Sequence, residues 1–257
     1  MTPAGRPVIL TYHSISPGRS PLKISPALFS EQMEWLKGNA RAVSLAELLE
    51  ALQQHKPLPE RAVVLTFDDG FRDFDSQAAP VLRRFGFPAT VFLPTAFCGR
   101  TNSWPGQAEW VEEAPLLDWE QIRNLAEQGI SFGAHGMTHA VLSEISGAEA
   151  EREIAGSKRE IEARTGRAPE VFCYPYGRWN PAVRTLVMRN YRGACSTAAG
   201  VVEPDADPFA LPRVDAHYLR NPAWFRSLFT RRFRAYVSAR RWIRRIRGQP
   251  EGTYARV

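Results

Sequence analysis

Apolar and polar residues follow one another along the chain in blocks that predict strands and helices in turn. Short buried strands are predicted at 7–13, 62–67, 86–93, 130–134, 171–174 and 192–197. Between them, helices are predicted from Ser25-Pro26, from Ser44 to about residue 55, and over 73–85, 118–128, 147–165 and 180–190. This alternation predicts an α/β fold with a parallel sheet.

The chain length and the last predicted elements suggest a boundary near residue 219. With 257 residues, the chain is long enough for one large α/β domain followed by a tail. Residues 98–115 are predicted to form a long irregular loop, and a Pro/Asp-rich loop is predicted through LPRVDAHY (211–218). We therefore expect a domain over 1–219 and one long basic amphipathic helix and tail over 220–257.

Polar, reactive residues stand where several predicted strands end. They are His13, the pair Asp68-Asp69, His135 and the pair Pro175-Tyr176. In parallel α/β sheets the carboxyl ends of the strands meet at one edge, and that edge carries the site. The pattern therefore predicts that these side chains converge.

Two short motifs among these residues have the chemistry of a metal site. Asp68-Asp69-Gly70 could be an ordinary turn, and the histidines of HGMTH (135–139) could be unrelated loop residues. However, the chain has only five histidines, and two of them fall within five positions at a strand end. One Asp and two His leave a coordination position open, as catalytic zinc requires, and Mn, Co or Fe would also accept these ligands.

At this point the chain resembles a known family. TFDDG (66–70), HGMTH (135–139), YPYG (174–177) and the linking GFPATVFL and LLDWEQIRNLAEQG resemble the polysaccharide deacetylases, also called the NodB homology domain or carbohydrate esterase family four. The resemblance covers roughly residues 7–217. It implies a distorted (β/α) barrel, a divalent metal such as zinc, and hydrolysis of an acetamide on a sugar.

The same resemblance implies a role for each motif residue. Asp68 would be the general base, and Asp69, His135 and His139 would be the metal ligands. Tyr176 would give its backbone N–H to the oxyanion, with Pro175 fixing the local backbone.

The sequence departs from the family pattern in two places. Where many relatives carry an arginine that orients the catalytic Asp, this chain has Cys173, for which a buried strand cysteine is the simplest interpretation. Arg213 is a candidate replacement. The usual C-terminal acid would be His217, but ILTYHSI places His13 at a strand end, as in exopolysaccharide deacetylases with an N-terminal strand histidine. We favour His13 as the general acid and keep His217 as the alternative.

Aromatic residues beside the strand-end loops are candidate sugar contacts, although large aromatics also fill cores. Substrate contact is predicted for Trp104, in a loop that looks exposed, and for Tyr174, Pro175 and Trp179.

Charge is concentrated in the tail. The net charge is +6, yet residues 220–247 hold ten arginines and no acidic residue, so 23 basic side chains remain elsewhere against 27 acidic ones. Aromatic and aliphatic residues lie among these arginines. Residues 222–247 are therefore predicted to form a helix with one of two roles. It either contacts an anionic membrane or glycan, or packs on the barrel with its basic face exposed to solvent. Nucleic acid is not expected, because no recognised nucleic-acid fold accompanies them.

The three cysteines, without a CxxC pair, fit a reducing compartment. The N-terminal apolar run is too short for a signal peptide, so we expect a cytoplasmic protein, at most peripheral at the inner face of the membrane. The function expected is metal-dependent N-deacetylation of a glycan or lipid-linked saccharide. The alternatives are a small-molecule amide hydrolase of the same fold and a non-catalytic adaptor that acts through its basic tail.

Overall fold

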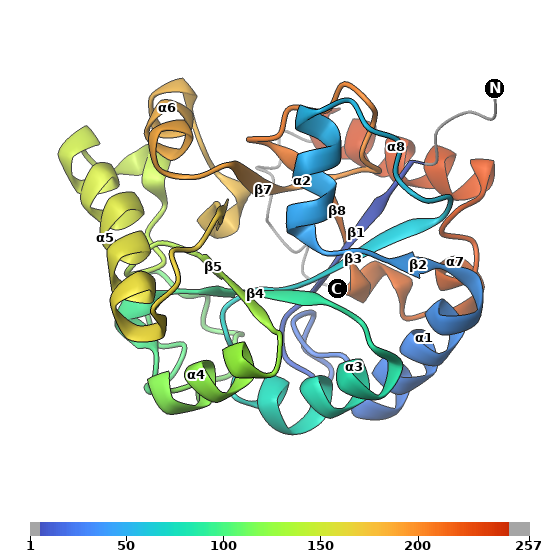
Figure 1. Ribbon diagram of the computed structural model, residues 1–257, viewed down its shortest axis with the longest axis horizontal. Helices are drawn as coiled ribbons and strands as arrows, with labels where there is room; N and C mark the ends of the chain where they lie inside the picture. The colour runs from blue at the N-terminus through green and yellow to red at the C-terminus, as the bar shows by residue number, and fades with distance from the viewer. Residues whose placement is uncertain (1–5, 247–257) are drawn as a thin grey trace.

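A closed parallel barrel forms the centre of the protein (Figure 1). The computed structural model describes residues 6–246. Its strands are β1 (Val8–Tyr12), β2 (Arg41–Ala42), β3 (Ala62–Phe67), β4 (Ala89–Leu93), β5 (Ser131–Ala134), β6 (Val171–Cys173), β7 (Gly193–Ala199) and β8 (Leu211–Asp215). They are ordered β1-β8-β7-β6-β5-β4-β3, and a β1–β3 pairing closes the ring, while β2 pairs only with β3. The predicted (β/α) barrel is therefore confirmed.

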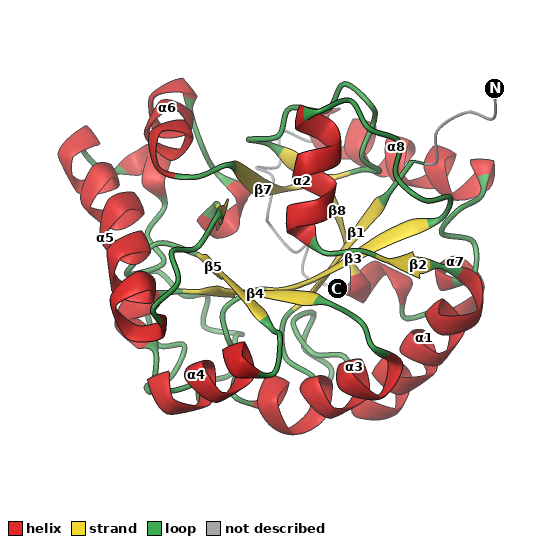
Figure 2. Cartoon of the chain, viewed as in Figure 1, coloured by secondary structure: helices red, strands yellow, loops and turns green. Residues whose placement is uncertain are grey.

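Helices surround this barrel (Figure 2). They are α1 (Pro26–Asn39), α2 (Leu45–Gln53), α3 (Ala79–Phe85), α4 (Trp119–Glu127), α5 (Gly147–Thr165), α6 (Pro181–Asn190), α7 (Pro222–Phe225) and α8 (Arg231–Ile246). Ser44, Asp118 and Ser146 each begin a helix with a capping box, in which side chain and backbone satisfy each other's free donors. None of the helices in the described part of the chain is long and apolar enough to span a bilayer.

Three predicted elements were wrong in detail. The loop predicted through 211–218 begins with strand β8, which closes the barrel between β7 and β1. Helix 73–85 begins with a π-helical turn at Phe74–Ala78 before α3. The long helix predicted from residue 222 is broken into α7 and α8 by a turn around Ser227.

The basic helix α8 packs on the barrel instead of standing apart from it. Phe233 and Val237 face inward and are buried, and α8 contacts β7. Its opposite side is exposed, with Trp242 64% accessible. Arg247, the last residue of the predicted membrane segment, lies outside the described residues.

Strand register brings the predicted site residues together. Tyr12 of β1 is paired with Phe67 of β3, and the Asp68 N–H donates to the Tyr12 carbonyl at 2.9 Å. The next residue, His13, therefore lies beside Asp68. Likewise the His135 N–H donates to the Leu93 carbonyl. This bond extends the hydrogen-bonded pairing of β4 and β5 by one residue.

Candidate active site

The carboxyl ends of the strands open into a pocket of about 290 Å³. Its lining includes these charged or polar residues: His13, Asp68, Asp69, His135, His139, Tyr176, Arg213 and Asp215. The strand-end residues predicted from the sequence therefore converge on one cavity, except for Pro175, which is not part of its lining. Neither Trp179 nor His217 is part of this lining.

Asp69, His135 and His139 present three ligand atoms to one point. Asp69 Oδ1 lies 3.5 Å from His135 Nε2 and 3.4 Å from His139 Nε2. All three residues are buried, with at most 5% of their surface exposed. Ligands about 2.1 Å from a tetrahedral metal would be separated by about 3.4 Å, so the donor set fits a divalent cation of the zinc type.

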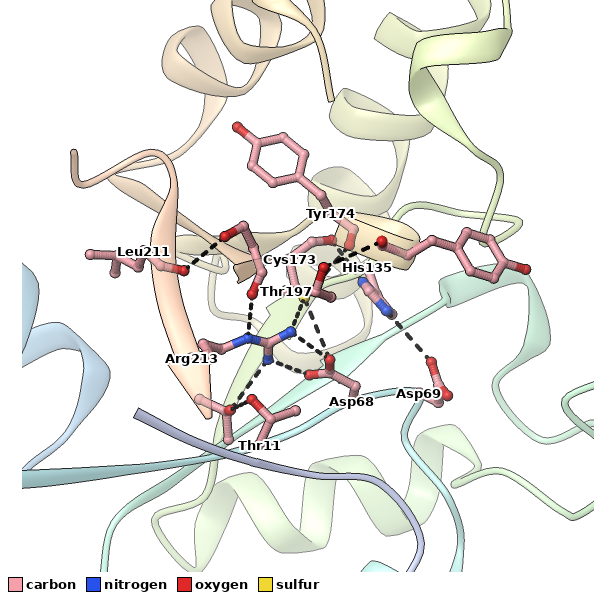
Figure 3. Close-up of polar contacts among 12 residues, drawn as sticks. Thr11, Asp68, Asp69, His135, Cys173, Tyr174, Thr197, Leu211 and Arg213 are labelled. Atoms are coloured by element: carbon pink, nitrogen blue, oxygen red, sulfur yellow. Dashed lines mark hydrogen bonds and ion pairs between the residues drawn. The ribbon is translucent and has the colours of Figure 1, made fainter. Parts of the chain in front are cut away.

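His135 is held in the form a metal ligand needs (Figure 3). Its Nδ1 lies 2.7 Å from the carbonyl oxygen of Cys173, which can only accept, so Nδ1 carries the proton and Nε2 keeps its lone pair. Burial, together with the neighbouring His139, lowers the pKa of His135 to about 4. The ring is therefore neutral and available to a metal at neutral pH.

A glutamate from α5 fixes the loop that carries His139. Glu153 Oε2 accepts the backbone N–H groups of Met137 and Thr138 at 2.7 and 2.9 Å, and Oε1 accepts the Thr138 hydroxyl at 2.8 Å. Gly136 leaves room for this carboxylate, because a Cβ there would lie 2.9 Å from Glu153 Oε2. Sequence reasoning missed Glu153, which looked like one more charge on a charged helix.

Backbone strain also concentrates at this site. Five non-glycine residues of the described chain have a positive φ, and three of them are Asp69 (70°), His139 (58°) and Tyr176 (56°). Such conformations persist where the surroundings enforce them, commonly at functional sites. After Tyr176, any side chain at Gly177 would be strained, because φ is positive and a Cβ would come within 1.9 Å of Thr197 Oγ1.

Asp68 is clamped by a buried arginine from β8 (Figure 3). Arg213 donates from Nη1 and Nη2 to the two carboxylate oxygens, both at 2.7 Å. Burial alone would raise the pKa of Asp68, but the charge and hydrogen bonds of Arg213 outweigh it and hold the pKa below its usual range. The hypothesis that Arg213 replaces the missing arginine is thereby confirmed.

Cys173 lies beneath this ion pair as a fully buried residue. Its Sγ is 3.1 Å from Arg213 Nη2 and 3.7 Å from Asp68 Oδ2. Asp68, His135 and Cys173 also satisfy the spacing of a metal site. However, burial raises the pKa of the Cys173 thiol, and Arg213 already occupies both oxygens of Asp68. This second group is a poor metal site.

The two candidate acids occupy different positions. His13 lines the pocket and is near enough to help lower the pKa of both Asp68 and Asp69. His217 lies outside the pocket lining, in the turn after β8, and burial lowers its pKa. The geometry therefore favours His13.

The predicted sugar contacts fall into two groups. Trp104 lines the pocket, but it is only 5% exposed, which corrects the expectation of an exposed loop. Its ring lies 4.2 Å from that of His139, so it packs against a predicted metal ligand. Tyr174 and Pro175 are buried, and Tyr174 donates its hydroxyl to the Phe209 carbonyl. Tyr174 nevertheless contributes to the pocket lining, whereas Pro175 and Trp179, which stacks on Tyr174, do not.

Comparison with known proteins gives consistent results. The family model described as polysaccharide deacetylase matches residues 55–191. YxkH of Bacillus subtilis, whose name assigns it to the polysaccharide deacetylases, is 30% identical over 82% of this chain and 71% of that protein. A poly-beta-1,6-N-acetyl-D-glucosamine N-deacetylase of Staphylococcus epidermidis is 27% identical over 72% of this chain and 65% of its own length.

A solved structure is similar over most of both chains. The Streptococcus pyogenes deacetylase PplD, in complex with acetate, superposes with a TM-score of 0.73 and 25% identity. The match covers 82% of this chain and 92% of PplD.

Proposed function

Because the chain belongs to the polysaccharide deacetylase family, and is therefore a hydrolase, we propose that it hydrolyses the acetamide of an N-acetylated sugar with the help of a divalent metal. The observation that carries this proposal is the placement of three converging metal-ligand atoms beside an ionised, clamped carboxylate in one pocket. A non-catalytic adaptor would have no use for this arrangement.

Asp69, His135 and His139 would hold the metal, with zinc as the first candidate. When bound, such a cation polarises a carbonyl oxygen and makes a water molecule acidic enough to ionise near neutral pH. The neutral Nε2 of His135 and the ionised Asp69 suit this role, because metal ligands must be deprotonated.

Asp68 would accept the proton of the attacking water. Its low pKa keeps the carboxylate ionised at neutral pH, and the two bonds from Arg213 fix its orientation. His13, across the register from Asp68, would donate a proton to the departing amine. Without that proton, the amine is a poor leaving group and the tetrahedral intermediate would revert.

Tyr176 would stabilise the oxyanion through its backbone N–H. Tyr176 has a positive φ and lies between Pro175 and Gly177, where a side chain would meet Thr197. This conformation turns the backbone of Tyr176 at the pocket edge. A fixed N–H donor of this kind is typically worth about 3–4 kcal/mol in the transition state.

For the substrate, we propose an N-acetylated glycan or a lipid-linked saccharide. The Staphylococcus epidermidis relative is named a poly-beta-1,6-N-acetyl-D-glucosamine N-deacetylase, which supports an N-acetylglucosamine unit. The exposed basic face of α8, with Trp242 at its outer side, supports peripheral contact with an anionic membrane. Flotation with anionic and neutral liposomes, using the protein and its Trp242→Ala variant, tests that contact.

The central experiment measures acetate released from N-acetylglucosamine oligomers and from lipid-linked N-acetylglucosamine. We expect release by the wild type, loss on chelation with recovery on adding divalent metal, and loss in Asp68→Asn. Release that survives both chelation and Asp68→Asn would falsify the proposed mechanism.

A further inference from the structure

The C-terminal helix α8 forms part of the pocket wall. Tyr236, Val237 and Arg240 of α8 line the pocket together with Tyr218, from the turn after β8. The same cavity reaches Asp69 and His139, so whatever binds at the metal-ligand set also meets α8. Residues 106–108 of the long loop, with the exposed Trp110 and Val111, contribute further lining.

Arg240 is held in place by aromatic side chains. Its guanidinium lies 3.8 Å from the centre of the Tyr218 ring, and its Nη1 donates to the Tyr236 hydroxyl at 3.2 Å. Tyr236 in turn stacks on Trp224 of α7, with ring centres 4.2 Å apart. These contacts fix a side chain that would otherwise be mobile, and therefore reduce the entropy lost when it binds a ligand.

Arg240 has no acidic partner within the described residues, in contrast to the other pocket arginine. Arg213 is neutralised by Asp68, whereas Arg240 forms a hydrogen bond with Tyr236 and lies over the rings of Tyr218 and Tyr236. A guanidinium has five N–H donors, and Tyr236 accepts from one nitrogen only.

The other two acidic residues of the pocket form no ion pair with Arg240 in the described part of the chain. Asp69 is surrounded by the two histidines of the predicted metal site. Asp215 accepts the backbone N–H of His217 at 2.8 Å. Among the described side chains of α8, Arg240 is therefore a positive group that faces the same space as the reacting centre.

We propose that Arg240, held over Tyr218, is an anion subsite that selects N-acetylated sugars carrying a phosphate or carboxylate close to the acetamido group. This inference rests on the proposed deacetylase function and adds the charge of the substrate to it. A guanidinium binds both oxyacids with two parallel hydrogen bonds, and a phosphate or a uronate would each present such an oxygen pair.

The test compares two substrates, one with an anionic phosphate and one that is neutral. Acetate release is measured as kcat/KM on N-acetylglucosamine 1-phosphate and on neutral methyl N-acetylglucosaminide. We expect the wild type to prefer the phosphate, and Arg240→Gln to reduce that preference by about tenfold or more through KM, as the loss of one charge-assisted hydrogen bond does. Arg240→Lys, which keeps the charge without the planar fork, should fall between the two.

Arg241→Gln is the matched control, because Arg241 is the neighbouring exposed arginine of α8 and does not line the pocket. It should leave the preference unchanged. A disaccharide of N-acetylglucosamine and a uronic acid, measured in the same way, tells whether the anion that Arg240 binds is a carboxylate or a phosphate. Equal rates on charged and neutral substrates, unaltered in Arg240→Gln, would overturn the inference while leaving the deacetylase standing. Absence of acetate from every substrate would instead overturn the proposed function.

Discussion

The floor and the α8 wall of the pocket are built in opposite ways. The floor consists of residues at strand ends, nearly all buried, and its charges are matched by protein groups, as Arg213 matches Asp68. The wall is a basic helix with an exposed outer face, and Arg240 meets the pocket without an acidic partner among the described residues. This contrast supports the proposal that the barrel residues carry out the reaction and that the helix packed against them selects the substrate.

The largest effect is expected from Asp69→Asn. The amide keeps the shape of the carboxylate but removes a charged ligand, so metal binding should fail and acetate release should fall by at least about 10³-fold, because the metal supplies several kcal/mol of transition-state stabilisation. Steady-state rates and bound metal are both measured. The exposed Asp205→Asn is the control. A variant that loses metal and retains full activity would show that the floor does not act through a metal.

Arg213→Gln tests whether the floor depends on its internal ion pair. Without the guanidinium, burial remains and raises the pKa of Asp68, so the carboxylate becomes protonated at a higher pH. The acid limb of the kcat/KM profile should therefore move to higher pH, with about a 10²-fold loss at neutral pH from the misplaced base.

Removing one partner of a buried ion pair typically costs about 3–5 kcal/mol, so the thermal unfolding of Arg213→Gln must be followed in parallel. Arg213→Lys retains the charge and should shift the acid limb less. An unmoved acid limb in a folded Arg213→Gln protein would contradict the assignment of Asp68 as base.

His13→Ala and His217→Ala separate the two candidate acids. Loss of a general acid typically costs about 10²-fold or more, so His13→Ala should show that loss, whereas His217→Ala, outside the pocket lining, should change kcat little. His13→Ala should hydrolyse an activated acetanilide at a rate closer to that of the wild type, because the amine of this substrate leaves more easily. The reverse pattern between the two variants would transfer the role to His217.

The smallest effect is expected from Cys173→Ala. The residue is buried, but Asp68 is oriented by Arg213, so the thiol has no essential part in the reaction. We expect kcat/KM within about threefold of wild type and a loss of stability of about 1 kcal/mol from the removed sulfur. Denaturant unfolding measures the second quantity. A loss of activity comparable to that of Arg213→Gln would mean that Cys173 positions the arginine.

Local sequence signals were enough to predict most of the helices and several of the strands. Helix 147–165 was predicted with the bounds it has, because Ser146 caps its start and Gly166 ends it in a left-handed conformation. The barrel was implied by the resemblance to the polysaccharide deacetylases, whereas the alternation of strands and helices followed from the local pattern of apolar and polar residues. These features depend on residues close in sequence, where propensity and capping decide the structure.

Long-range features were harder to predict. Strand β8 was hidden by Pro212 and by a charged residue, Arg213, which a buried strand tolerates only because Asp68 lies opposite. That pairing spans 145 positions and leaves no local trace. The burial of Trp104 and the role of Glu153 depend in the same way on how a loop folds over the barrel.

Metal content measured on the purified protein tests the central claim most directly. After stripping and reloading with zinc, we expect about one metal ion per chain in the wild type, with acetate release rising in proportion to occupancy. Asp69→Asn and His135→Ala should each lose the ion while remaining folded. Full acetate release by wild-type protein that contains no divalent metal would contradict the account.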